Sequence, residues 1–269
     1  MALPRMTPGV KLLLAINVLV FVLNALAQGA LSGSSSSGWL ALWWDGLWEG
    51  YGLGLVRLVT YQFTHAFVSP MHLLLNMLFL YFFGTFVEEA VGRRRLLRLY
   101  LASGLIGGIL HMVVGFATGS GGWLVGASGA VYGIMMYAAI LAPRMRVIFI
   151  VFPIELRWLV GVLVGIGVYH LYVQLVVSVG SQVSDSAHVG GALAGFLVHR
   201  LERSSSNLSI LGGVKRRWAV RRNRELDRKQ AILDELLEKV HRQGIGSLTP
   251  AEKRFLDKAS AELRGRDRR

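Results

Sequence analysis

Six apolar stretches, most of them long enough to cross a bilayer, constrain what this chain can fold into more than any other feature. A membrane-spanning helix needs roughly 20 apolar residues, and within hydrocarbon only helices and closed barrels satisfy every backbone hydrogen bond internally. The predicted spans are residues 10–27, 71–87, 96–117, 123–142, 158–179 and, shorter than the rest, 187–198. The sequence therefore predicts an all-α membrane protein with a bundle of six transmembrane helices.

Charge is separated from this apolar part. The chain has a net charge of +13, and nineteen of its 29 Lys and Arg residues follow residue 199. This separation predicts a membrane domain over residues 1–203, a basic linker over 204–224 and a small two-helix cytoplasmic domain over 225–269. Within the last part, residues 226–242 have the apolar periodicity of an amphipathic helix, and Thr249 to Glu252 form a capping box that starts a second helix.

The distribution of basic residues also predicts the orientation. If the N-terminus is cytoplasmic, nine of the ten Lys and Arg residues before residue 200 lie at cytoplasmic ends, and only Arg57 lies outside. Residues 10–27 lack a small-residue cleavage site, so we interpret them as a retained first span and not as a signal peptide. Residues 147–154 are too few to cross and indicate an interfacial segment.

Several kinds of active site are disfavoured by what the chain lacks. It has no cysteine, which excludes disulfides and thiolate chemistry. It has no His-Glu-x-x-His pattern for zinc, and no Asp or Glu lies deep in a predicted span, which disfavours an aspartyl intramembrane protease.

The remaining polar residues of the spans gather at one depth. His72 and Asn76, four residues apart, share a face near the outer end of the second span, and Ser128 and Tyr132 share a face at the outer end of the fourth. His188 begins the sixth span at its outer end. This coincidence predicts a site at the outer face of the bundle.

Serine hydrolysis is the chemistry that this set of residues fits. Ser128 would be a nucleophile that His188 activates as general base, with donors from His72, Asn76 and the Ser128 N–H for the oxyanion. The alternative is packing: Gly-x-Ser-Gly at 126–129, and Gly191 with Gly195, are also patterns of close helix contact. Two further histidines, 111 and 170, have no patterned partner and are interpreted as structural. Asp185 is interpreted as a capping residue, although it is placed to orient His188.

Taken together, five sequence motifs resemble the rhomboid family of intramembrane serine proteases over about the first 200 residues. They are Arg57-Leu-Val-Thr with Phe63-Thr-His65, His72-x-x-x-Asn76, Gly84-x-x-x-Glu88-x-x-x-Gly92, Gly126-Ala-Ser128-Gly with Tyr132, and Ala187-His188-x-x-Gly191-x-x-x-Gly195. Two departures are Val56, where the family often has tryptophan, and a longer interval from His65 to His72.

The resemblance implies roles for these residues. Ser128 and His188 would be the catalytic dyad, and His72, Asn76 and Gly126 would lie on the oxyanion and substrate side. Tyr132 would stack on His188, and Gly191 and Gly195 would bring its helix close to that of the serine. Arg57 would stabilise the first outer loop, and Glu88 the inner end of the second helix.

The implied function is endoproteolysis of transmembrane substrates near the outer face, without metal or cofactor, in a bacterial inner membrane with both termini cytoplasmic. A silent relative that escorts membrane clients is the alternative, although such relatives typically lack the serine or the histidine. A transporter is a weaker alternative, because paired discontinuous spans would be expected. The basic tail is expected to contact anionic lipid headgroups, and nucleic-acid binding is not expected, since no such motif is present.

Overall fold

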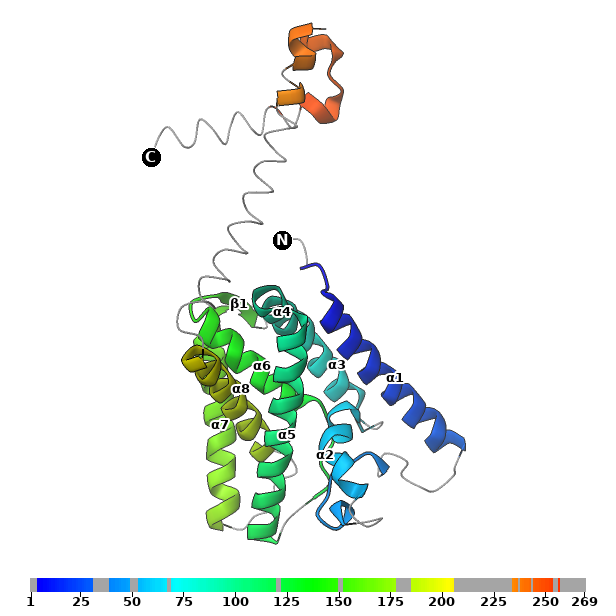
Figure 1. Ribbon diagram of the computed structural model, residues 1–269, viewed down its shortest axis with the longest axis vertical. Helices are drawn as coiled ribbons and strands as arrows, with labels where there is room; N and C mark the ends of the chain where they lie inside the picture. The colour runs from blue at the N-terminus through cyan, green and yellow to red at the C-terminus, as the bar shows by residue number, and fades with distance from the viewer. Residues whose placement is uncertain are drawn as a thin grey trace. The chain divides into compact units, whose positions relative to one another are not determined.

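The computed structural model describes residues 4–30, 39–48, 53–66, 69–119, 122–149, 152–177, 185–205, 234–236, 238–242, 244–253 and 256. Helices dominate these residues, as predicted (Figure 1). The longer helices are α1 (Pro8–Ala30), α3 (Pro70–Phe79), α4 (Thr85–Val91), α5 (Arg93–Thr118), α6 (Ser128–Leu141), α7 (Leu156–Val177) and α8 (Asp185–Ser205). The short elements are η2 (Asp45–Leu47), η3 (Leu53–Val56), α2 (Arg57–Thr60), η4 (Tyr61–Phe63), the π-helical turn η5 (Leu80–Gly84), β1 (Arg146–Phe149), β2 (Phe152–Glu155) and η6 (Ile245–Ser247).

Four helical segments among the described residues are long and apolar enough to cross a membrane: Pro8–Ala27, Pro70–Val91, Arg93–Thr118 and Leu156–Val176. The predicted count of six spans is therefore not confirmed. The stretch predicted at 123–142 forms a helix only from Ser128 to Leu141, which is 14 residues. Helix α8 has 21 residues but carries Asp185, Arg200, Glu202 and Arg203, which lower its mean hydropathy.

Proline and glycine set several helix boundaries. Pro8 and Pro70 stand at helix starts, where the missing N–H costs nothing. Gly92, with φ 90°, separates α4 from α5 and lets the chain reverse. Gly119, with φ 63°, ends α5 in the left-handed conformation that favours glycine.

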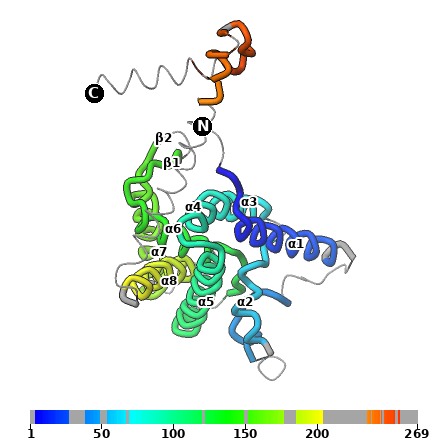
Figure 2. The backbone as a smooth tube through the Cα atoms, turned by 45° about the horizontal axis from the view of Figure 1, so that its top comes forward, coloured from blue at the N-terminus to red at the C-terminus, as the bar shows by residue number. Residues whose placement is uncertain are grey.

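The core of the membrane domain is the contact of α8 with α5 and α6 (Figure 2). Neighbouring glycines of α8 face the two partners. A Cβ on Gly190 would come within 2.9 Å of the Gly107 Cα in α5. A Cβ on Gly191 would overlap the carbonyl oxygen of Gly129 in α6. The absence of side chains therefore allows three helix backbones to approach closely, as membrane bundles commonly require.

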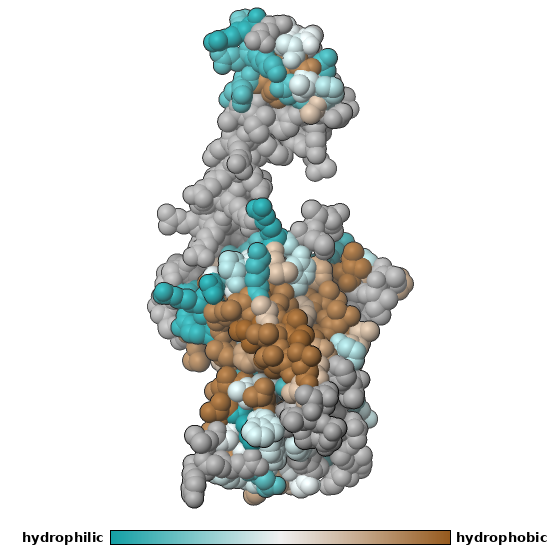
Figure 3. Space-filling view, turned by 90° about the vertical axis from the view of Figure 1, so that its right-hand side faces the viewer, coloured by the Kyte–Doolittle hydropathy of each residue, from teal (hydrophilic) through white to brown (hydrophobic). Residues whose placement is uncertain are grey.

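Apolar side chains cover much of the outside of this domain. Figure 3 shows hydrophobic residues gathered over the middle of one face of the membrane domain. The exposed apolar residues of α1 and α7 include Leu19, Leu26, Tyr169 and Val176. In water such a surface would be unfavourable, whereas lipid chains cover it without cost. The exposure is that of a protein embedded in a bilayer.

Two details differ from the sequence predictions. Residues 146–149 and 152–155 pair as antiparallel strands, in register from Arg146 with Glu155 to Phe149 with Phe152, where only an interfacial segment was predicted. Helix α8 continues through Ser205, so Ser204 and Ser205 belong to that helix and not to the predicted linker. The sequence prediction ended this helix at residue 198, where the apolar stretch ends, because the last residues of the helix are polar.

The chain divides into two compact units, Met1–Leu208 and Ser209–Arg269. In the second unit the predicted capping box is confirmed: the Thr249 N–H donates to Glu252 Oε2 at 2.6 Å, and the Glu252 N–H donates to Thr249 Oγ1 at 3.3 Å. Lys239 Nζ also donates to the Glu252 carboxylate. The basic patch predicted at 215–224 lies outside the described residues.

Candidate functional site

Ser128 stands at the first position of α6, directly after a segment that the first outer loop holds in place. Leu124 exchanges two backbone hydrogen bonds with Leu42, and the Gly126 N–H donates to the Tyr61 carbonyl at 3.0 Å. Gly126 has φ 118°, a conformation that L side chains rarely adopt, and turns the chain into the helix. The N–H groups of a first helical turn have no partner within the helix, so the Ser128 N–H is available at this point.

His188 lies in the first turn of α8, opposite Ser128. Its Nε2 is 2.8 Å from the Ser128 Oγ, a hydrogen-bond distance. The approach depends on Gly191 and Gly195, because a Cβ on either would overlap a carbonyl oxygen of α6. His188 is also partly shielded, with 14% of its side chain exposed.

Tyr132, one turn after Ser128, lies flat against the same imidazole. The two ring centroids are 4.4 Å apart and the rings are within 2° of parallel. A stacked aromatic ring restricts rotation of the imidazole about its own axis. This is the arrangement that the resemblance implies, and it keeps Nε2 directed at Ser128.

His72 and Asn76 lie on the other side of the Gly126 turn. A Cβ on Gly126 would come within 2.6 Å of His72 Cε1, so the glycine admits the ring against the backbone. Asn76 is buried, and its Nδ2 donates to the His72 carbonyl at 3.0 Å and lies 3.3 Å from His65 Nε2. The predicted oxyanion donors thus line the turn that leads into Ser128.

His65, to which the sequence assigned no role, joins these parts. Its ring is fully buried, and its Nε2 accepts the Ala127 N–H at 3.4 Å while facing the Asn76 amide. Burial, together with the neighbouring His72, lowers the pKa of His65 to about 4. A neutral ring with an unprotonated Nε2 has one lone pair at that atom, which the Ala127 N–H and the Asn76 amide share. Only the shared motif with Phe63 and Thr64 marked this residue in the sequence.

Arg57 and Glu88, the two charged residues to which the resemblance assigns stabilising roles, make separate contacts. The Arg57 guanidinium lies 3.9 Å above the Trp43 ring, which in turn stacks on Trp123 at 4.5 Å. These contacts join the outer loop to the segment before Ser128. At the other end of the domain, the Glu88 carboxylate accepts the Gly9 and Val10 N–H groups, both at 2.9 Å.

The remaining polar residues near the dyad have partners that the sequence did not predict. His111 Nδ1 is 3.1 Å from Ser186 Oγ, and its Nε2 is 3.2 Å from the Gly122 carbonyl oxygen. His170 Nδ1 is 3.1 Å from Asp185 Oδ2. Among the described residues, no three His, Cys, Asp or Glu side chains are grouped to hold a metal ion.

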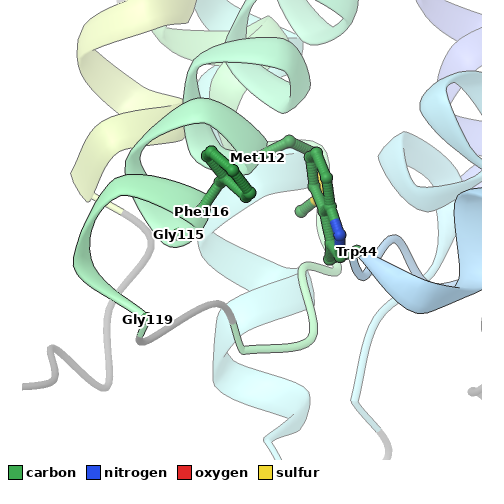
Figure 4. A pocket seen from close by; sticks show the side chains of 5 residues that line it. All are labelled: Trp44, Met112, Gly115, Phe116 and Gly119. Atoms are coloured by element: carbon green, nitrogen blue, oxygen red, sulfur yellow. The ribbon is translucent and has the colours of Figure 1, made fainter.

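A cavity of about 230 Å³ lies at the C-terminal end of α5 (Figure 4). Its lining consists of Trp44, Met112, Gly115, Phe116 and Gly119. Trp44 and Phe116 stack with centroids 4.9 Å apart, which places an outer-loop ring on the helix. Neither Ser128 nor His188 lines this cavity, so it is separate from the candidate site.

Comparison with known proteins identifies the family. The Rhomboid domain model matches residues 53–204, more than half of the chain. A family of unknown function, DUF6576, matches residues 220–262. The RHOMBOID-like protein 12, mitochondrial, of Arabidopsis thaliana is 32% identical over 51% of this chain and 44% of its own length. The Rhomboid protease GlpG of Enterobacter sp. (strain 638) is 29% identical over 71% of this chain and 62% of its own length.

The matches to the two relatives span less than two thirds of either relative's length. The Rhomboid domain model covers all the candidate site residues, from Arg57 to Gly195. The family match, the helical fold and the membrane-length apolar helices agree with one another. The chain is an integral membrane protein and belongs to the Rhomboid family.

Proposed function

We propose that this protein is an intramembrane serine endopeptidase that cleaves transmembrane segments of membrane proteins near the outer membrane face. The observation that carries the proposal is the 2.8 Å separation of His188 Nε2 and Ser128 Oγ. A serine hydroxyl becomes a competent nucleophile when such a base accepts its proton. An inactive family member would need neither this hydrogen bond nor a ring stacked to hold the base.

The chemistry proceeds in two stages. Ser128 Oγ attacks the scissile carbonyl carbon while His188 Nε2 takes the hydroxyl proton, and His188 then gives that proton to the leaving amine. A water molecule, activated by the same base, hydrolyses the resulting ester and releases Ser128. Both stages pass through a tetrahedral oxyanion, and both use one imidazole alternately as base and acid.

The oxyanion forms beside the Gly126 turn. His72, Asn76 and the Ser128 N–H are the proposed donors, and each such donor typically contributes about 2.7–4 kcal/mol to the transition state. His65 holds the Asn76 amide and the Ala127 backbone in a fixed arrangement. The Asn76 amide has two N–H groups, one donated to the His72 carbonyl and one facing His65 Nε2, so Asn76 must give up one of these contacts to reach the oxyanion.

The membrane placement is part of the proposal. Basic residues cluster at the end of the membrane domain where α1 begins and α8 ends. The positive-inside rule assigns that end to the cytoplasm. We place the protein in a bacterial inner membrane with both termini cytoplasmic and the dyad toward the outer face. The basic tail would then lie where anionic headgroups can bind it.

Labelling by a fluorophosphonate probe tests the activated serine. Purified wild-type protein in detergent is compared with Ser128→Ala and His188→Ala, with Ser103→Ala as the matched control because Ser103 is a buried serine of a different helix, α5. We expect labelling of the wild type and of Ser103→Ala only. Equal labelling of Ser128→Ala would show that another residue reacts and would refute the assigned nucleophile.

A further inference from the structure

The Asp185 carboxylate lies between the imidazoles of His170 and His188. Its Oδ2 is 3.1 Å from His170 Nδ1, and its Oδ1 is 3.9 Å from His188 Nδ1. Only 7% of the Asp185 side chain is exposed, so water screens this charge poorly. One carboxylate thus faces the same ring nitrogen of two histidines, one of them the proposed base.

The hydrogen bond to Ser128 determines which ring nitrogen of His188 carries the proton. If Nε2 accepts the Ser128 hydroxyl, the proton of the neutral ring is on Nδ1. That N–H is on the side of Asp185. A separation of 3.9 Å is longer than a hydrogen bond, but hydrogen bonds of catalytic groups are often long before substrate binds.

The charge acts even at this distance. When His188 takes the serine proton it becomes a cation 3.9 Å from a shielded carboxylate. Opposite charges at such a separation favour the charged form of each group. The carboxylate therefore stabilises the protonated His188 that exists only during the reaction.

His170 fixes the carboxylate from a different helix. Asp185 is the first residue of α8, while His170 lies in α7, which packs against α8. The N–H groups of the first turn of α8 are a second favourable position for this carboxylate. The hydrogen bond from α7 keeps Oδ1 on the His188 side.

We propose that Asp185 is a positioning residue for the Ser128–His188 pair: held by His170 of α7, it orients the His188 ring through Nδ1 and stabilises its protonated form. The inference rests on the proposed function for its catalytic consequence, but the effect on His188 itself does not require turnover. The competing explanation is a purely structural bond that fastens α7 to α8.

The other titratable groups around His188 come from three elements. Tyr132 of α6 stacks on the ring, His72 of α3 faces it across the site, and His170 of α7 reaches it through Asp185. Asp185→Asn leaves each of these three side chains in the protein, and it preserves the shape of the Asp185 side chain while removing its charge. A change in the pH response of that variant is therefore assigned to the carboxylate.

The first test is the pH dependence of peptide-bond cleavage by Asp185→Asn. Loss of the carboxylate should lower kcat about tenfold with KM unchanged, and should move the acid limb of the kcat profile about 1 pH unit lower. The direction follows because His188 without its counter-charge binds a proton less readily. Asp185→Glu should restore part of kcat. An unchanged kcat and acid limb would overturn the proposal, even if the variant unfolds at a lower temperature.

The second test separates this inference from the proposed function. The imidazole of His188 is followed by NMR against pH in the full chain in detergent, comparing Ser128→Ala with Ser128→Ala/Asp185→Asn, neither of which needs to turn over. We expect the His188 midpoint to fall by about 1 pH unit in the double variant. A coincident midpoint would refute the role of Asp185. A shifted midpoint in a protein whose wild type cleaves nothing would refute the proposed function alone.

The variant His170→Gln tests whether His170 holds the Asp185 carboxylate in place. If His170 holds the carboxylate, this variant should change the acid limb in the same direction as Asp185→Asn, but less. Combined with Asp185→Asn it should add no further loss, since both changes act through one carboxylate. A fully additive double variant would show that His170 acts independently of Asp185.

Discussion

Gly191 determines how closely the helix of His188 approaches the helix of Ser128. A Cβ there would overlap the Gly129 carbonyl oxygen, which belongs to backbone and cannot rotate away. The hydrogen bond between the two side chains therefore depends on a residue that takes no part in chemistry. A methyl group at this position would move α8 away from α6 as a whole.

Gly191→Ala should consequently reduce both stability and serine reactivity. We expect a cost of about 1–3 kcal/mol, typical of an overpacked core, and loss of fluorophosphonate labelling. Thermal unfolding in detergent and probe labelling measure the two effects. Gly165→Ala in α7 is the control, because a Cβ there meets nothing within 4 Å. Normal labelling of Gly191→Ala would contradict the proposed role of this contact.

His65 makes a prediction of a different kind, because it acts as a hydrogen-bond acceptor within the core. His65→Phe would leave the Ala127 N–H and the Asn76 amide facing an apolar ring. An unsatisfied buried donor costs about 1–3 kcal/mol. We expect a lower unfolding temperature and slower turnover as the Asn76 amide loses its fixed orientation. Turnover equal to that of the wild type would show that the oxyanion donors do not depend on His65.

At the scale of elements, Glu88 joins the start of α1 to the first turn of α4. Its buried carboxylate accepts two N–H groups from the first turn of α1, where the helix dipole also favours a negative charge. Thr7 Oγ1 donates to the same carboxylate at 2.5 Å. These bonds fix the start of α1 to α4.

Glu88→Ala should loosen α1. Removing the acceptor leaves those N–H groups without their partner, at a cost of about 1–3 kcal/mol. We expect a lower unfolding temperature and faster hydrogen exchange at the start of α1. Glu155→Ala is the matched control: it removes a partly exposed pair with Arg157, which contributes at most about 1 kcal/mol. Exchange at α1 that is the same in both variants would contradict the anchoring role.

For the whole molecule, the division at Leu208 predicts that catalysis belongs to the first unit. All the candidate site residues precede that point, and α8 ends at Ser205. Deletion of residues 209–269 should leave fluorophosphonate labelling in detergent unchanged, because no residue of the site is removed. Loss of labelling in a truncated protein that still unfolds cooperatively would show that the tail takes part in the catalytic fold.

The sequence located most helices because a bilayer requires long apolar runs, and runs of that kind are visible without any structure. It misjudged the one containing Ser128, since residues 123–127 are apolar yet are held in an extended turn by Leu42 and Tyr61. Hydropathy cannot distinguish an apolar loop from an apolar helix. Gly126, with φ 118°, lies in this segment, two residues before the helix starts at Ser128.

The site was predictable to the extent that its residues share a depth or a helical face. Ser128 with Tyr132, and His72 with Asn76, are each four residues apart. The contact between His170 and Asp185 joins two helices, and that between His65 and Ala127 joins two loops, at separations of 15 and 62 residues. No periodicity within one element encodes such contacts, which depend on how the helices pack.

The central claim is that Ser128 and His188 cleave peptide bonds within a membrane. Its most direct test reconstitutes the full chain in liposomes with a set of single-span model proteins and identifies the products by mass spectrometry. We predict cuts within the transmembrane segment near its outer end by the wild type, and none by Ser128→Ala or His188→Ala. Model proteins that bind the wild type but remain uncut, or cuts that persist in Ser128→Ala, would contradict the account.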